Sequence, residues 1–313
     1  MRKDRFALAG LALILVFAVL AVEGVASQAA GPPEIERDGI TPRDSLPTRA
    51  VEVAGPPAEA APHPILSDVQ VRKAIAHCTD RDAIVEAVDP TLTPAERQEL
   101  ILDTFIHPDS DFYTAPATTY PFNPATGNSL LEAAGWTLPM GGTYRMKGGK
   151  ELALTLTAPD SPERRAIVSE FATQMEACGI RVLANFQPGS WVFSDDTGVA
   201  VRDFEAAEYA WHHTGDDPGG EWMYACDSVP SPANGWWAGG NVMGWCNTAA
   251  SEAIEQASDT NLSQPVRKGH YATFLELFAQ DVPQLALYMR PGGMADDYTW
   301  EHIDFGLETF SQE

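Results

Sequence analysis

Basic side chains are scarce in this sequence. Its 313 residues include 20 Lys and Arg against 44 Asp and Glu, a formal net charge of −24 at pH 7. A surface this acidic repels phosphate backbones and anionic lipid headgroups, so we expect no nucleic-acid partner. The hydrophobic fraction of 44% is nevertheless sufficient for the core of one or two domains.

The sequence also lacks the short motifs of common enzyme classes. It contains no phosphate-binding loop, no Gly-x-Gly-x-x-Gly, no Gly-x-Ser-x-Gly and no His-Glu-x-x-His. These absences favour a binding protein without a cofactor over an enzyme.

One segment, WHHTGDDPGGEW, gathers possible metal ligands: His212, His213, Asp216, Asp217 and Glu221. Adjacent histidines on a strand point to opposite faces, and Asp-Asp-Pro-Gly-Gly is an ordinary turn sequence. We therefore expect no metal site. A metal-dependent hydrolase centred on His212, His213 and Asp216 is the least favoured alternative.

Long apolar runs are absent after the N-terminus. Basic residues precede an apolar run over residues 6–22, and small residues follow it. This pattern predicts a signal peptide within residues 1–30 and export to the periplasm or the extracellular face. An uncleaved membrane anchor formed by residues 6–22 is the alternative.

Residues 31–62 are rich in Pro, Ala and charge and have no helical stripe, so we expect a linker. A single domain is expected from residue 63 to residue 313. The patterns predict two short helices within residues 67–88 and a third that begins at about residue 94. Further helices are predicted at 123–134, 161–178, 248–258 and 264–281. Strands are predicted at 151–158, 180–186 and 283–290. The expected N-caps are Thr79, Thr93, Asn123 and Ser161. The strand–helix–strand order over 151–186 predicts a parallel pair, and residues after 291 receive no assignment.

Only four cysteines are present. Export favours disulfides, and Cys226 and Cys246 flank a segment without periodicity, so we predict that they pair. Cys78 and Cys178 lie in apolar helical patterns, where buried free cysteine is common, and we expect both to stay reduced.

Tryptophans gather in one part of the chain. Six lie between residues 191 and 245, namely Trp191, Trp211, Trp222, Trp236, Trp237 and Trp245. Trp211 and Trp245 fit a core position as well as a ligand site. Trp236 and Trp237 stand among Gly and Asn inside the loop that the predicted disulfide closes. We expect these two to face a cleft, because aromatic walls with a few polar groups are typical of small-ligand sites.

Several segments, in this order, resemble one protein family. They are HPILSDVQVRKAIAHCTDRDAIVEAV, YPFNPATGNSLLEAAGWTL, QMEACGIRV, YACDSVPSPANGWWAGGNVMGWCN and DVPQLALYMR. Over roughly residues 63–290 the chain resembles the second half of extracellular solute-binding proteins of family 5, the oligopeptide- and dipeptide-binding receptors of ABC importers.

The resemblance implies an α/β fold: a periplasmic-binding-protein-like lobe of type II, with a mixed sheet flanked by helices and with most of the first lobe missing. It implies the substrate-binding component of an ABC importer for peptides or similar small solutes, which acts by ligand binding and lobe closure. The implied partners are the ligand, permease subunits and a separately encoded first lobe. In that family a carboxylate often holds the peptide amine; here Thr214 stands at that position and the acids are shifted to Asp216 and Asp217. The candidate ligand contacts are Trp191, Trp211, His213, Asp216, Asp217, Trp236, Trp237 and Asn241.

The main alternative is an exported or membrane-tethered interaction module derived from a truncated solute-binding protein. The short region before residue 63 supports this alternative, because family members usually have about two hundred more residues there.

Overall fold

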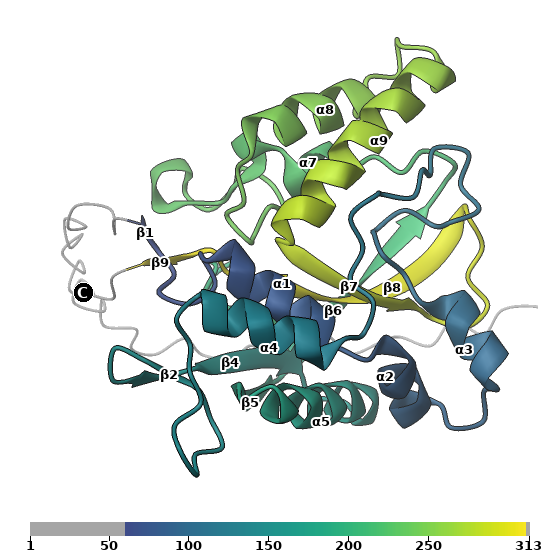
Figure 1. Ribbon diagram of the computed structural model, residues 1–313. Coiled ribbons are helices and arrows are strands. Elements are labelled where there is room, and N and C mark those ends of the chain that lie inside the picture. Colours follow the sequence, from purple (N-terminus) through teal and green to yellow (C-terminus); the bar gives the residue numbers. More distant parts are fainter. Residues whose placement is uncertain (1–59, 311–313) are drawn as a thin grey trace, which may run out of the picture. The chain divides into compact units, whose positions relative to one another are not determined.

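A five-stranded mixed sheet forms the centre of the computed structural model, which describes residues 60–310 (Figure 1). The strand order is β5-β4-β6-β8-β7. The strands are β4 (Ala153–Pro159), β5 (Arg181–Gln187), β6 (Ala206–Thr214), β7 (Gln284–Met289) and β8 (Asp297–Phe305). Strand β4 runs parallel to β5 and β6, whereas β8 is antiparallel to β6 and β7. This α/β architecture with a mixed sheet is the one expected from the sequence.

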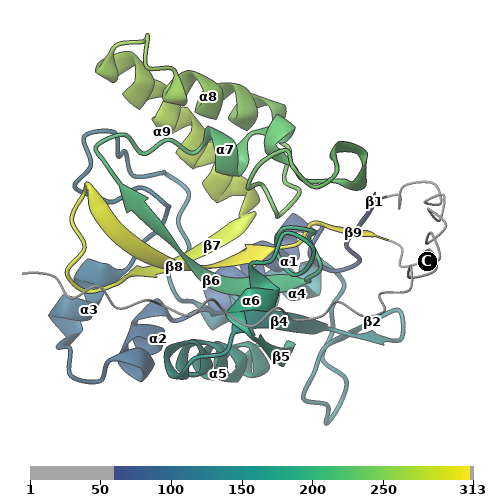
Figure 2. The ribbon, with the colours of Figure 1, turned by 180° about the vertical axis from the view of Figure 1, so that it is seen from behind.

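Helices flank both faces of the sheet (Figures 1 and 2). They are α1 (Val69–Cys78), α2 (Arg81–Val88), α3 (Pro94–Leu100), α4 (Pro124–Ala133), α5 (Pro162–Ala177), α6 (Gly189–Val192), α7 (Glu221–Tyr224), α8 (Thr248–Ser258) and α9 (Gln264–Asp281). Figure 1 shows α1 and α4 in front of the sheet, and the reverse view in Figure 2 shows α6 on the other side. A small hairpin, β2 (Met146–Lys147) with β3 (Lys150–Glu151), precedes β4.

Three of the four predicted helix caps are confirmed. Thr93, Asn123 and Ser161 each accept a hydrogen bond from a backbone N–H in the first turn of α3, α4 and α5. The prediction for α2 was wrong by one residue, because Asp80 is the cap. The Thr79 hydroxyl instead donates to the carbonyl of Ile75 at 2.8 Å, so it satisfies the end of α1.

The β4–α5–β5 unit sets up the two faces of the sheet. Leu154 and Leu156 are buried in the core that α5 shares, and Thr155 and Thr157 alternate with them on the opposite face. Residues on β5 alternate in the same way, so Asn185 stands beside Thr157. The predicted parallel pair is therefore confirmed, and its second face is polar.

Strand β8 lies in the stretch after residue 291 that the sequence left unassigned. It is paired on both sides and almost wholly buried. Three ionisable residues, Glu301, His302 and Asp304, break the apolar alternation that marks a strand. Neighbouring elements supply the partners of the Glu301 and Asp304 carboxylates, whereas the ring nitrogens of His302 have no hydrogen-bond partner among the described residues.

The two ends of the described chain lie together. Strand β1 (Ala60–Pro62) pairs antiparallel with β9 (Glu308–Phe310). Residues 60–62, the end of the expected linker, thus form β1. The predicted signal peptide and the rest of the linker fall outside the described residues. Within residues 60–310 no helix is long and apolar enough to cross a membrane.

Both disulfides involve the described residues. Cys226 is joined to Cys246, as predicted. The expectation of reduced thiols at Cys78 and Cys178 is corrected, because these residues form the second disulfide. Cys78 ends α1 and Cys178 caps the C-terminus of α5. Their Cα atoms are 6.4 Å apart although 100 residues separate them in sequence, a contact that the local helical pattern does not reveal.

Candidate ligand-binding site

An aromatic-lined cavity of about 510 Å³ lies on the sheet face opposite α5. Tyr209 and Trp211 of β6 form its floor, since Ala207, Tyr209 and Trp211 share the face of Thr157. The walls come from Phe193 after α6, from Trp222 of α7 and from the loop between Cys226 and Cys246. We call this the aromatic cavity.

The rings around the aromatic cavity contact one another edge to face. Centroids are 5.6 Å apart for Phe193 and Tyr209, 5.8 Å for Tyr209 and Trp211, and 5.6 Å for Trp211 and Trp222. Trp237 and Trp222 are 75% and 55% exposed, which is unusual for such large apolar side chains. The cavity thus presents rigid aromatic surface to solvent.

The loop between Cys226 and Cys246, which we call the stapled loop, carries Trp236 and Trp237. Trp236 has a φ of 67°, a left-handed conformation that a bulky residue rarely adopts. Its ring stands edge to face on Phe310 of β9, with centroids 5.1 Å apart. Such backbone strain persists only where the surroundings hold it, and here the Phe310 contact helps to fix the ring.

A second cavity, of about 770 Å³, shares Trp236 with the first. We call it the polar cavity, because its sheet wall is formed by four uncharged polar side chains: Thr155, Thr157, Asn185 and Gln187. Asn185 donates to the Thr157 hydroxyl at 3.2 Å, and Gln187 donates to the Asn185 carbonyl at 2.8 Å. Trp191 and the carboxylates of Asp196, Asp203, Glu205 and Glu308 also line this cavity.

Arg202 ties the stapled loop to β9 beside the polar cavity. Its guanidinium donates to the carbonyls of Pro230, Val242 and Met243 and to Glu308 Oε2 at 2.9 Å. The side chain is 2% exposed, and its guanidinium carbon lies 5.0 Å from the centre of the Phe310 ring. Burial is the main cause of its lowered pKa, which the ion pair with Glu308 opposes. The positive charge of Arg202 is therefore already paired with a carboxylate of the protein.

A buried polar cluster supports the floor of the aromatic cavity. The Tyr209 hydroxyl donates to Asp304 Oδ2 at 2.5 Å, and Gln284 donates to Asp304 Oδ1 at 2.7 Å. The ring of His302 packs against Tyr209 with centroids 4.4 Å apart. Burial, with the Asp304 charge, raises the pKa of Tyr209 well above its ordinary value, so the phenol keeps its proton and its bond.

The eight residues singled out in the sequence do not all lie together. Trp211, Trp236 and Trp237 line the aromatic cavity, and Trp191 lines the polar cavity. Trp222, which the sequence did not single out as a contact, lies in the aromatic cavity; its only sequence signal is its place in the tryptophan-rich stretch.

The other four line neither cavity. Asn241 is fully buried and donates to the carbonyls of Ala225 and Trp245, so it supports the stapled loop. Asp217 binds Arg267 at 2.6 Å; burial acts to raise the pKa of Asp217, but bonds from Arg267 and the Gly219 N–H bring it below its ordinary value.

The two remaining residues lie near the end of β6. The His213 ring donates from Nε2 to the Gly215 carbonyl at 2.7 Å. Asp216 borders a separate surface hollow with Asp109 and Asp111. No group of three or more His, Cys, Asp or Glu side chains in residues 60–310 is arranged to hold a metal ion.

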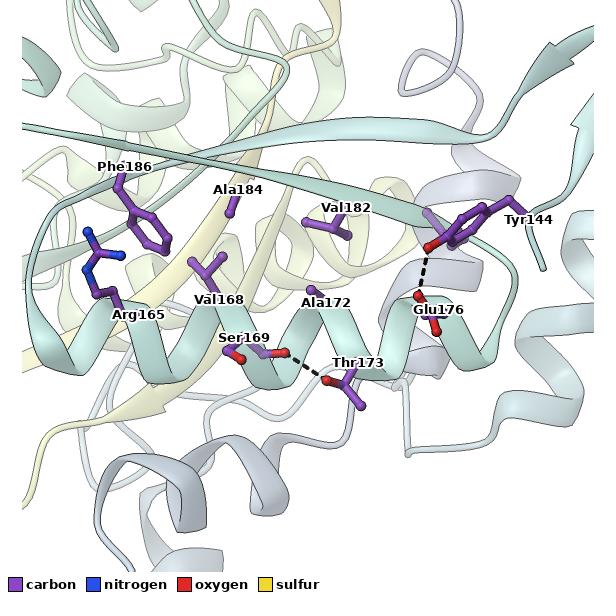
Figure 3. Close-up of a pocket in the computed structure, with 11 residues that line it drawn as sticks. Tyr144, Arg165, Val168, Ser169, Ala172, Thr173, Glu176, Val182, Ala184 and Phe186 are labelled. Carbon is purple, nitrogen blue, oxygen red and sulfur yellow. Dashed lines mark hydrogen bonds between the residues drawn. The ribbon is translucent and has the colours of Figure 1, made fainter.

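A groove on the opposite side of the sheet separates α5 from the edge strand β5 (Figure 3). Val182, Ala184 and Phe186 point from β5 toward α5, and the guanidinium of Arg165 lies 4.4 Å from the Phe186 ring centre. None of the residues singled out in the sequence lines this groove. It follows the seam where α5 packs on the sheet, and its shape is explained by that packing.

Comparison with known proteins places these features in context. A family model described as "Bacterial extracellular solute-binding proteins, family 5 Middle" matches residues 28–230. The oligopeptide-binding protein OppA of Mycobacterium tuberculosis is 27% identical over 151 residues, which are 48% of this chain and 24% of that protein. The chain therefore spans about a quarter of the length of the curated relatives it matches.

Solved structures share the fold at lower identity. AppA of Bacillus subtilis, in complex with a nonapeptide, has a TM-score of 0.59 at 18% identity, over 80% of this chain and 47% of that one. A periplasmic oligopeptide-binding protein of Thermotoga maritima, bound to mannohexaose, has a TM-score of 0.59 at 17% identity, over 79% and 46% of the two chains. At these identities the likeness shows the fold alone.

Proposed function

Because the chain belongs to the bacterial extracellular solute-binding proteins of family 5, we propose that it is the substrate-binding component of an ABC importer. Its solutes are peptides or similar small molecules, and its mechanism is reversible binding without covalent chemistry. The observation that carries this proposal is the pair of adjoining cavities that share Trp236. Concave sites that combine aromatic walls with a few polar groups are typical of small-ligand binding.

Lobe closure is part of the proposal. Strands β1 and β9 lie side by side where the described chain begins and ends, and Phe310 of β9 contacts Trp236 of the cavity wall. A first lobe that meets this one across the two cavities, on the same polypeptide or on another, would complete a closed cleft. Ligand that contacts both lobes would favour the closed form, because it binds that form better.

Location and partners follow from the same reading. The family is extracellular by description, so we propose that the mature chain acts in the periplasm or at the outer face of the membrane. There the closed form would dock on the permease subunits of the importer.

A thermal-shift screen of the full chain tests the proposal. The panel contains short peptides and neutral oligosaccharides, because proteins of this fold have been solved with a nonapeptide and with mannohexaose. We expect a saturable rise in melting temperature with one class, since a ligand that prefers the native state stabilises it. Trp237→Ala should weaken that shift without loss of folding, because Trp237 is largely exposed.

Phe122→Ala is the matched control. Phe122 is 50% exposed and lies before α4, and it lines neither cavity. If Phe122→Ala and Trp237→Ala weaken the shift equally, the cavity is not the binding site. If a well-folded chain responds to no solute, the interaction-module alternative replaces the receptor.

A further inference from the structure

The linings of the two cavities carry more acidic than basic side chains. Among residues 60–310, Arg202 is the one basic residue of the two linings, and its guanidinium is already bound to three carbonyls and to Glu308. No described Lys or His belongs to either lining. A solute that brings a carboxylate or phosphate to this site would find no free cation among the described lining residues.

Acidic side chains, in contrast, remain available at the rim. Asp195 borders the aromatic cavity, and Asp196 and Asp203 border the polar cavity. All three are exposed, and among the described residues none forms an ion pair. Glu205 accepts from the Thr155 N–H at 2.6 Å and contacts His63 at 3.4 Å, so each of its carboxylate oxygens already has a partner within the protein.

The aromatic rings add a second preference that does not depend on the carboxylates. The faces of tryptophan rings attract cations, and they also accept flat apolar groups. Trp236 is shared by both cavities, with Trp191 on its polar side and Trp237 on its aromatic side. A group bound in one cavity therefore lies next to a group bound in the other, because both cavities reach Trp236.

From this arrangement, and resting on the proposed receptor function, we propose that the lobe selects solutes in which a bulky aromatic group adjoins a cationic group. The aromatic group occupies the aromatic cavity, and the cation occupies the polar cavity near Trp191, Asp196 and Asp203. Among peptides, the preferred ligands carry a Lys or Arg side chain next to an aromatic residue. Acidic solutes are rejected because the uncompensated carboxylates repel them.

Isothermal titration of the full chain with four blocked tripeptides tests this selectivity. The peptides are N-acetylated and C-amidated, so terminal charges play no part: Lys-Trp-Lys, Gln-Trp-Gln, Glu-Trp-Glu and Lys-Ala-Lys. We expect Lys-Trp-Lys to bind about tenfold more tightly than Gln-Trp-Gln or Lys-Ala-Lys, the ratio that one favourable contact of moderate strength gives. Glu-Trp-Glu should bind most weakly, and the preference for Lys should shrink at high salt.

Variants assign each half of the preference to its cavity. The double variant Asp196→Asn, Asp203→Asn should lower the ratio of Lys-Trp-Lys to Gln-Trp-Gln affinity toward one. Trp237→Ala should lower the ratio of Lys-Trp-Lys to Lys-Ala-Lys affinity. Glu99→Gln on α3 removes one exposed charge outside both linings and should leave both ratios unchanged.

The outcomes separate the selectivity from the receptor function. Equal binding of basic and acidic peptides, or binding of a neutral oligosaccharide but of no peptide, overturns the selectivity and keeps the receptor. A chain that is folded by circular dichroism but binds none of these probes overturns both.

Discussion

At the scale of single residues, buried charge is the feature that most constrains this protein. Arg164 lies between the fully buried carboxylates of Glu208 and Glu301, 2.9 Å from each. Burial, together with the neighbouring Glu301, raises the pKa of Glu208 well above its ordinary value, and Arg164 opposes that rise. Removing one partner from such a group leaves another buried charge uncompensated, so these residues tolerate little substitution.

Arg202 gives a direct test of this principle near the site. Arg202→Met removes four donated hydrogen bonds and leaves three carbonyls and Glu308 without their partner. We expect the free energy of unfolding to fall by about 3 kcal/mol, measured by urea denaturation. Arg165→Met is the matched control, because Arg165 also pairs with an acid and lies over an aromatic ring but is exposed. A similar loss in both variants would contradict the structural role of Arg202.

Glu276 predicts a pH dependence of stability. Its carboxylate accepts hydrogen bonds from the Thr118 hydroxyl and from the N–H groups of Ala117 and Thr118. These bonds hold the loop before α4, which contains Ala117 and Thr118, against α9. The side-chain bond from Thr118 is the main cause of its pKa of about 2, below the ordinary 4.5. A lowered pKa contributes stability that is full above about pH 4.5 and is lost as the pH falls toward 2.

Urea denaturation of the native chain and of Glu276→Gln at pH 7 and pH 3 measures this contribution. The native chain should be the more stable at pH 7, and the difference should shrink at pH 3. A difference that stays constant between the two pH values would show that the carboxylate charge contributes nothing.

At the scale of elements, helix α1 packs unusually close to α4. Gly127 lies inside α4, and a Cβ atom placed there would stand 2.5 Å from Cys78 Sγ and 3.0 Å from the Ala74 carbonyl. Glycine weakens an isolated helix, so its presence here is explained by this contact. The same contact brings Cys78 to the place where α5 ends at Cys178, and the disulfide then joins these elements.

A pair of Gly→Ala substitutions separates helix propensity from packing. Gly269→Ala in α9 meets no atom within 4 Å, so we expect the free energy of unfolding to rise by about 0.5–1 kcal/mol. Gly127→Ala gains the same propensity but must displace α1, and we expect a net loss of about 1–3 kcal/mol. Thermal or urea unfolding of both variants checks this. Stabilisation by both substitutions would contradict the close approach of α1 and α4.

The elements also show how far the sequence predicts the structure. The β4–α5–β5 unit follows from local patterns, since Leu154 and Leu156 alternate and Ser161 caps the helix. Strand β8 does not follow from local patterns, because Glu301 and Asp304 are satisfied by residues on other elements. Arg164 and Tyr209 are distant in sequence, and Arg290 and Gln284 come from β7 and the turn that follows it.

The candidate site also has features that follow from local sequence and others that depend on distant residues. Trp236 and Trp237 are neighbours in sequence and lie in one loop, so their shared place in the aromatic cavity is a local property. Asp217 is as good a ligand in sequence, but Arg267, fifty positions later, binds it. The Cys78–Cys178 pair was missed because two apolar helical patterns do not say which helices meet.

At the scale of the whole described unit, the stapled loop connects the cavities to the two ends of the described residues, strands β1 and β9. Trp236 rests on Phe310, and Arg202 binds both the loop carbonyls and Glu308. Among the described residues, strand β9, which carries Phe310 and Glu308, pairs with the three residues of β1 and with no other strand. Strand β8, in contrast, lies inside the sheet and is hydrogen-bonded to both β6 and β7. We therefore expect the β1–β9 pair to open locally more often than β8.

Amide hydrogen exchange tests this connection. Without ligand, β8 should exchange slowest and the β1–β9 pair early, because short exposed strands open at low cost. A bound ligand that contacts Trp236 stabilises the stapled loop, and through Phe310 and Glu308 it should slow exchange in residues 308–310 as well. Slowed exchange in residues 226–246 with unchanged exchange in β9 would show that the loop and the chain ends open independently, and lobe closure would then need another route to sense the ligand.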